Sequence, residues 1–203
     1  MARRSDHSRE QIQQMALDAA RDIVARDGYT GLSARKVAKT IGYTVGTLYL
    51  VFANLDELVM RANAQTLDAL YEVMLATKAR CKNARACIMA LGQAYIRFAS
   101  ENTHLWGMIY EHPLPDRDAI PDWYRERVAR NLALVEDTLQ PLAKNTSAQQ
   151  LAVAARALWG GVHGICILAL TNKLDVVGAA SVPALVESLI DNYLKGLTAK
   201  RQR

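Results

Sequence analysis

The stretch on which the fold of this chain depends, Ser33 to Leu58, reads SARKVAKTIGYTVGTLYLVFANLDEL. Ser33 is placed to cap a short helix, because its hydroxyl can accept a backbone N–H of the first turn. Gly42 ends that helix where a left-handed residue is needed, and Thr44 is placed to cap the next helix. Two short helices joined by a tight turn predict a helix-turn-helix, which lays its second helix in the major groove of DNA.

The same segment lacks acidic side chains. From Gly28 to Leu55 it has three basic residues, Arg35, Lys36 and Lys39, and no Asp or Glu. A surface without carboxylates suits the phosphate backbone of DNA, which would repel them. Along the second helix we expect Leu48 and Tyr49 to face inward and Leu50 to be exposed.

This pattern resembles the TetR family of bacterial transcriptional regulators, over about the first sixty residues. The family implies a homodimer that binds double-stranded DNA at a palindromic operator and releases it when a small effector binds. The residues that carry the resemblance are Leu32-Ser33, Val37-Ala38, Ile41-Gly42-Tyr43, Gly46-Thr47-Leu48-Tyr49, Phe52 and Asp56-Glu57-Leu58.

Two positions depart from the family pattern. Val51 stands where the family often has His or Tyr, and Leu55 stands where it usually has Lys. In the family both positions commonly contact phosphates. The departures predict fewer backbone contacts, or a transfer of those contacts to the N-terminal arm.

The expected DNA contacts divide by role. Residues of the turn and second helix should meet base edges or nearby phosphates, the two tyrosines should contact phosphates, and the basic residues should add charge. Arg4 belongs to an arm that either reaches the minor groove or stays a solvated terminus. The predicted set is Arg4, Arg35, Lys36, Tyr43, Thr44, Val45, Gly46, Thr47 and Tyr49.

The whole chain suits a DNA-binding protein of the cytoplasm. It has 203 residues, about half hydrophobic, and a net charge of +5 that is compatible with nucleic acid. Three cysteines without a CxxC pair favour a reducing compartment, and no apolar run follows the N-terminal arginines. The most apolar stretch, 157–171, is too short for a membrane span and is predicted to be a buried helix.

Helical periodicity continues throughout, so the predicted fold class is all-α. We expect a helix-turn-helix domain at 1–53 and a helical effector-binding and dimerisation domain at 54–203. The second opens with a long helix, from Asn54 to about Cys81. In the TetR family this helix links the two domains, and the resemblance therefore implies that a ligand would act through it. Three prolines in 113–121 predict a loop.

The last two predicted helices are candidates for a dimer interface, in which two helices of each subunit form a four-helix bundle. The alternative is that both helices fill the monomer core. Small residues in the first of them permit another helix to approach closely. The predicted interface residues are Leu158, Ile165, Leu185, Leu189, Ile190 and Tyr193.

Large aromatic side chains gather in the middle of the chain and predict an apolar effector pocket. Trp159 with His163-Gly164 resembles a Trp, His and Gly signature of one TetR subgroup, and one helical turn separates the first two. The alternative is that these aromatics are ordinary core. The predicted pocket residues are Phe98, Trp106, Tyr110, Trp159 and His163.

Other classes of function have less support. The sequence shows no Gly-rich phosphate loop, nucleophile elbow or HExxH pair, so we expect no enzyme and no cofactor. His104 and His112 are eight residues apart, but no Cys or carboxylate cluster completes a metal site. A helical interaction protein without DNA activity is the main alternative, and an enzyme with an apolar cavity ranks below it.

Overall fold

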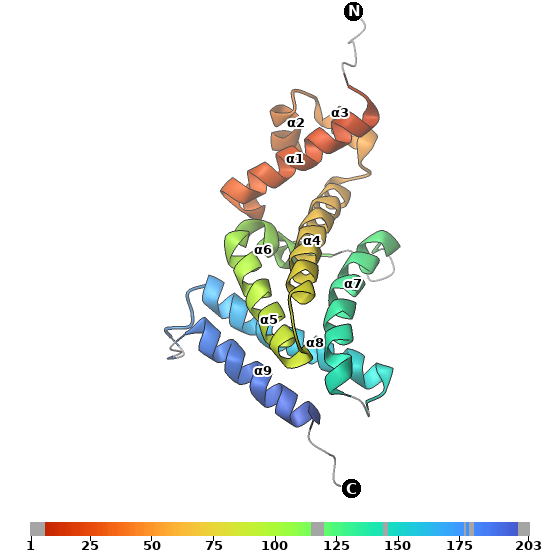
Figure 1. Cartoon of the computed structure of the whole chain (residues 1–203). Coiled ribbons are helices and arrows are strands. Elements are labelled where there is room, and N and C mark those ends of the chain that lie inside the picture. Colours follow the sequence, from red (N-terminus) through yellow and green to blue (C-terminus); the bar gives the residue numbers. More distant parts are fainter. Residues whose placement is uncertain (1–6, 115–119, 144–145, 177, 179–180, 199–203) are drawn as a thin grey trace, which may run out of the picture. The chain divides into compact units, whose positions relative to one another are not determined.

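The protein is described by a computed structural model that covers residues 7–114, 120–143, 146–176, 178 and 181–198. Within these ranges every regular element is helical, as predicted (Figure 1). Two short 3-10 turns, Tyr29–Gly31 and Gln140–Leu142, accompany the α-helices. The α-helices are α1 (Arg9–Asp27), α2 (Ala34–Thr40), α3 (Val45–Val51), α4 (Leu55–Ala79), α5 (Ala84–Glu101), α6 (Thr103–Glu111), α7 (Asp122–Leu139), α8 (Ala148–Leu170) and α9 (Val182–Thr198).

The chain forms two compact units. The first comprises Met1–Thr66 and Asn102–Arg125, and the second comprises Leu67–Glu101 and Glu126–Arg203. The compact first unit therefore extends beyond the helix-turn-helix segment and includes α6. The functional boundary between 1–53 and 54–203 remains a prediction.

Three helix starts in the first unit are capped by a hydroxyl side chain, and two of these caps, Ser33 and Thr44, are those that the sequence predicts. The Ser8 hydroxyl accepts the Gln11 N–H in a capping box, and Ser33 accepts the N–H of Lys36. Thr44 accepts the N–H of Thr47, at 3.2 Å, and opens α3. Between α2 and α3, Gly42 has a φ of 75°, the left-handed conformation that lets the two helices turn sharply.

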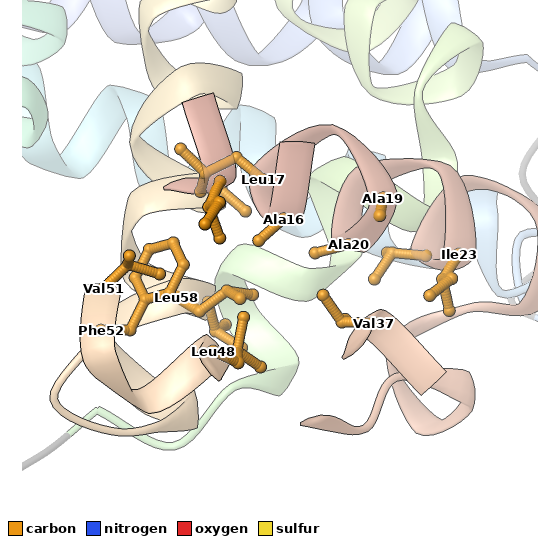
Figure 2. Close-up of a cluster of buried hydrophobic side chains, with 14 of the residues drawn as sticks. Ala16, Leu17, Ala19, Ala20, Ile23, Val37, Leu48, Val51, Phe52 and Leu58 are labelled. Atoms are coloured by element: carbon orange, nitrogen blue, oxygen red, sulfur yellow. The ribbon is translucent and has the colours of Figure 1, made fainter. Parts of the chain in front are cut away.

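An apolar cluster holds the helix-turn-helix against α1 and the start of α4 (Figure 2). Leu48 of α3 and Val37 of α2 are almost completely buried in it, beside Phe52 and Leu58. Val51 is buried in the same cluster and Leu55 packs against it, so the two departures from the family pattern have inward-facing side chains. Burial in the core explains why apolar residues occupy both positions.

Tyr49 differs from the expected inward orientation. Its side chain is 46% exposed, and Leu50 beside it is 70% exposed. The reason is that α3 is only seven residues long, so Leu48 and Val51 suffice to anchor it to the cluster. Tyr49 is thereby available at the surface.

In the second unit, α5, α8 and α9 pack together at two glycines. A Cβ atom on Gly92 of α5 would come within 2.9 Å of the Ile190 side chain. One on Gly161 of α8 would come within 2.7 Å of Leu189. Glycine at these positions therefore lets α9 approach both helices closely, and for Gly161 this agrees with the predicted role of the small residues in α8.

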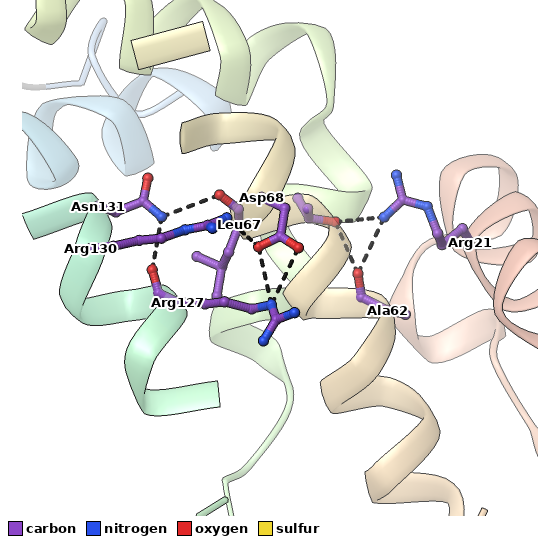
Figure 3. A network of polar contacts seen from close by, with 8 residues as sticks. Arg21, Ala62, Leu67, Asp68, Arg127, Arg130 and Asn131 are labelled. Carbon is purple, nitrogen blue, oxygen red and sulfur yellow. Dashed lines mark hydrogen bonds and ion pairs between the residues drawn. The ribbon is translucent and has the colours of Figure 1, made fainter. Parts of the chain in front are cut away.

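A polar network joins the second-unit parts of α4 and α7 (Figure 3). Asp68 of α4 accepts hydrogen bonds from Arg127 and Arg130 of α7, and the Arg130 guanidinium also lies over the Tyr71 ring, 4.4 Å from its centroid. The Asn131 amide donates to the Leu67 carbonyl. Within the first unit, Arg21 of α1 donates to the Ala62 carbonyl and to Thr66.

The apolar stretch at 157–171 is less buried than predicted. It belongs to α8, which has 23 residues and is long and apolar enough to cross a membrane by length and composition alone. Only 28% of its most apolar window is buried. Val153 is 63% exposed, and Ala157, Gly160 and Gly164 are exposed along the same side of the helix.

Candidate nucleic-acid interface and ligand cavity

The described residues predicted to contact DNA lie on or between α2 and α3. Arg35, Thr44 and Gly46 are exposed, together with Tyr49, whereas Tyr43, Val45 and Thr47 are partly buried. Arg4 lies outside the described residues. The exposed surface between Gly28 and Leu55 thus presents hydroxyl groups, backbone and basic side chains and no carboxylate of its own.

Two side chains of this surface already have intramolecular partners. The Lys36 ammonium donates to the Gly31 carbonyl at 2.8 Å and lies 3.9 Å from an Asp27 carboxylate oxygen. The Tyr43 hydroxyl lies 2.8 Å from Nδ1 of His7, a residue that the sequence did not indicate as part of the surface. Arg35 and Tyr49 are therefore the more accessible of the predicted phosphate contacts.

Thr44 and Thr47 form a small hydroxyl pair at the start of α3. Their Oγ1 atoms lie 3.0 Å apart, and Thr44 also caps the helix. The pair presents hydroxyl groups at the helix N-terminus, where backbone N–H groups favour phosphate oxygens. Val45 follows with a partly buried apolar side chain suited to contact a thymine methyl.

The aromatic residues predicted to form one pocket lie in different units. Trp106 and Tyr110 belong to the first unit, where their ring centroids are 4.8 Å apart, and Trp106 is 2% exposed. Phe98, Trp159 and His163 belong to the second unit. Spacing along a helix brings Trp159 and His163 together, but it does not indicate which other aromatics join them.

A small apolar cavity of about 40 Å³ lies within the second unit. Of the predicted pocket residues, Trp159 alone is among its lining. The cavity lies between α4, α5, α7, α8 and α9, and its lining residues are Met74, Ile88, Leu91, Gly92, Tyr95, Val135, Leu158, Trp159, Val162 and Ile190.

Polar groups adjoin one wall of this cavity. The Tyr95 hydroxyl lies 2.8 Å from Nδ1 of His163, and the His163 ring stacks on Trp159 with centroids 5.2 Å apart. Burial lowers the pKa of His163, so the imidazole is neutral at pH 7. The sequence missed Tyr95 as the partner, because only the packing of α5 against α8 places it there.

Two predicted interface residues are core residues of the subunit itself. Leu158 is 3% exposed and Ile190 is 1% exposed, and both line the cavity. Leu189 packs on Gly161, and Tyr193 donates its hydroxyl proton to the Ala154 carbonyl at 2.9 Å. Ile165 and Leu185 are partly buried. The apolar stripe of α9 thus serves mainly the core, because it packs inward on α5 and α8.

Comparison with known proteins identifies the family. The N-terminal part, residues 16–62, matches the family of bacterial regulatory proteins of the tetR type. Residues 88–193, more than half of the chain, match the tetracyclin repressor-like C-terminal domain. The chain belongs to the TetR family. Its fold and its helix-turn-helix are therefore those of DNA-binding transcriptional regulators, and the second match spans Trp159, His163 and Gly164.

Solved structures of other proteins resemble the TetR-family fold of this chain. A protein of unknown function from Rhodococcus sp. RHA1 is 21% identical with a TM-score of 0.76, and the match covers 97% of this chain and 100% of that one. FadR of Bacillus subtilis, solved in complex with stearoyl-CoA, is 16% identical with a TM-score of 0.66 over 90% of this chain and 98% of its own.

A TetR-like transcriptional regulator from Rhodococcus sp. RHA1 is 19% identical, with a TM-score of 0.62 over 96% of this chain and 100% of its own. No curated protein matches the chain. At these identities the structural likeness establishes the fold alone.

Proposed function

We propose that this chain is a ligand-responsive repressor that binds a palindromic operator as a homodimer in the cytoplasm. The observation that carries the proposal is the exposed, carboxylate-free surface of a capped helix-turn-helix in a member of the TetR family. Thr44, Val45, Gly46 and Thr47 meet base edges or adjacent phosphates. Tyr43 and Tyr49 contact phosphates, and Arg35 and Lys36 supply charge, with Arg4 in the adjoining arm.

The homodimer is supported by the exposed apolar side of α8. A helix whose apolar residues remain in water is unfavourable unless something covers them. Because Gly160 and Gly164 have open space where a Cβ would stand, a partner helix can approach α8 closely there. A second copy of α8 packs on that side, and Leu185 and Ile165 adjoin the bundle as partly buried contacts.

The effector is an apolar molecule held in the second unit beside Trp159 and His163. The FadR neighbour from B. subtilis was solved in complex with stearoyl-CoA, and that complex supports an effector that carries an acyl chain. Ligand pockets for small molecules measure roughly 300–1,000 Å³. The cavity of about 40 Å³ therefore has to open when ligand binds. Such a rearrangement is the expected origin of a ligand-dependent change in DNA affinity.

The first test is DNA binding by fluorescence anisotropy over a salt series, with DNA that flanks the gene for this protein. We expect tight binding to one palindromic segment, two subunits per site, and a logarithmic affinity that falls linearly with the logarithm of salt concentration. Equal, weak binding to all sequences would reject that segment as the operator. No binding at low salt would reject the DNA-binding function and favour the helical interaction protein.

The second test is ligand binding followed by tryptophan fluorescence, with fatty acyl-CoA thioesters of different chain length as probes. A probe that quenches or shifts Trp159 emission should also lower operator affinity. The Trp159→Phe variant identifies the signal, because Trp106 and Trp123 remain. If operator affinity is unchanged by every probe that binds, the protein is not a ligand-released repressor of this class.

A further inference from the structure

Two cysteine side chains that the proposed function does not use converge where α4 ends and α5 begins. The Cys81 thiol donates to the Thr77 carbonyl at 3.2 Å, and the Cys87 thiol approaches the next carbonyl, that of Lys78, at 4.0 Å. The backbone N–H of Cys81 donates to the same Lys78 carbonyl at 3.1 Å. Both sulfurs therefore gather around one helical end within the second unit.

Cys81 also influences the ionisation of Cys87. Burial and then the adjacent Cys81 raise the pKa of the Cys87 thiol to about 12. A disulfide requires the two sulfurs to approach to about 2.05 Å, and the two thiols already point to consecutive carbonyls of the same helical end. Asn83, which caps α5 through the Ala86 N–H, lies in the short connection that would close the ring.

We propose that Cys81 and Cys87 form a reversible redox-modification site whose co-reactant is a hydroperoxide. Their unequal exposure assigns the roles. Cys81 is half-buried and open to a small oxidant, whereas Cys87 is buried behind it. An accessible thiol beside a shielded one is the arrangement in which the first is oxidised and the second resolves it.

The chemistry balances in two steps. The sulfur of Cys81 attacks the terminal oxygen of hydrogen peroxide, the O–O bond breaks, and Cys81 sulfenic acid and one water form. The sulfur of Cys87 then attacks the Cys81 sulfur, the S–O bond breaks, and the departing hydroxide takes the Cys87 proton as a second water. Both cysteines are oxidised by one equivalent of peroxide, and a dithiol reductant reverses the product.

The test treats the full-length reduced protein with a small excess of hydrogen peroxide, blocks the remaining thiols and digests with trypsin. Cleavage after Arg80, Lys82 and Arg85 leaves the two cysteines on separate peptides, Cys81–Lys82 and Ala86–Arg97. We expect these peptides to be linked with the loss of two hydrogens and to separate on reduction. Oxidation of Met89, which lies on the second peptide, adds the mass of one oxygen atom and is therefore distinguished from the loss of two hydrogens.

Two variants fix the roles of the thiols, and Cys166, which is fully buried in α8, is the internal control. In Cys81→Ser, Cys87 should stay reduced. In Cys87→Ala, Cys81 should accumulate sulfenic acid that dimedone traps.

Several outcomes would overturn the proposal: a link that involves Cys166 or two subunits, irreversible oxidation of Cys81 without a link, or no reaction at peroxide that oxidises free cysteine. The readout is sulfur chemistry alone, so its failure leaves the proposed DNA binding untouched.

Discussion

At the scale of single residues, exposure separates the two tyrosines of the helix-turn-helix. Tyr43 has His7 as a partner, whereas the ring of Tyr49 stands at the surface of α3. A surface side chain contributes little to folding, so its substitution isolates the effect on DNA. Tyr49 is therefore the best single position at which to test the phosphate contacts.

Tyr49→Ala should weaken binding to every DNA sequence by roughly 10- to 100-fold. The physical reason is that a hydrogen bond to a charged group contributes about 1.5–3 kcal/mol, and about 1.4 kcal/mol changes affinity tenfold. Fluorescence anisotropy measures the loss of affinity for the operator and the loss of affinity for unrelated DNA. Val176→Ala, at another exposed position, should bind as the unsubstituted protein does. An unaltered affinity for Tyr49→Ala would contradict the assignment.

Val45→Thr should instead change sequence preference. An apolar contact to a thymine methyl is a base-specific contact, and a hydroxyl at the same place makes different hydrogen bonds. Binding to a set of operators with single base-pair changes measures the effect. We expect the ranking of sites to shift by about 1–3 kcal/mol at one position. A uniform loss over all sites would show that Val45 reads no base.

His163 should make stability depend on pH between 5.5 and 7.5. Its pKa is lowered by burial from 6.5, so below pH 6.5 the unfolded chain binds more protons than the folded one. The stability that the neutral imidazole contributes is therefore fully present above pH 6.5 and is lost as the pH falls. Denaturant unfolding at pH 5.5 and at pH 7.5 measures the change in the free energy of unfolding between them. This change should be smaller in His163→Gln than in the unsubstituted protein. Burial also lowers the pKa of His112, which leaves a residual dependence. An unchanged difference in the variant would contradict the prediction.

At the scale of elements, glycine positions decide how closely helices pack. Gly92 lies where α5 meets α9, against Ile190 and Val186, whereas Gly196 of α9 has no neighbour within 4 Å of an added Cβ. Both glycines lie within helices, so the same substitution changes helix propensity at each site. The difference in stability between the two variants therefore reports the packing around Gly92.

Gly92→Val should destabilise the fold by about 1–3 kcal/mol relative to Gly196→Val, because extra methyl groups would overpack a filled contact. A difference of that size lowers the melting temperature by several degrees in a chain of this length, at roughly 2–4 °C per kcal/mol. Thermal unfolding followed by circular dichroism measures it. Equal melting temperatures for the two variants would mean that the side chains around Gly92 move into the adjacent cavity and relieve the overpacking.

At the scale of the whole molecule, the exposed side of α8 is the feature that one subunit leaves unexplained. Its residues are small or apolar, and covering them favours association with a second copy. Because a homodimer would present two helix-turn-helix motifs, we expect operator binding to depend on this association.

Ala157→Arg should convert the dimer to a monomer and lower operator affinity at the same time. A guanidinium on the exposed side of α8 leaves the subunit fold intact but cannot be buried against a second copy without a partner charge. Ala129→Arg, which adds the same group to an exposed position on α7, is the matched control. Sedimentation velocity gives the masses. If the unsubstituted protein is a monomer at micromolar concentration, α8 is not a dimer interface.

The local signals in the sequence were sufficient for the helix-turn-helix. Ser33 and Thr44 cap where predicted, and Gly42 adopts the left-handed turn. Such features depend on residues within one or two helical turns, which sequence spacing specifies directly. The all-α class follows from the same periodicity. The orientation of Tyr49 was predicted wrongly, because helical periodicity alone does not say where the buried face of a two-turn helix ends.

Tertiary structure alone decided which distant side chains meet. The hydrogen bond between Tyr95 and His163 and the burial of Leu158 and Ile190 depend on how helices far apart in sequence pack. Apolar periodicity shows that a helix has a buried face, but an apolar side chain packs equally well against many partners. The sequence by itself therefore determined the family, the fold class and the DNA-binding motif, and packing determined the cavity and the free face of α8.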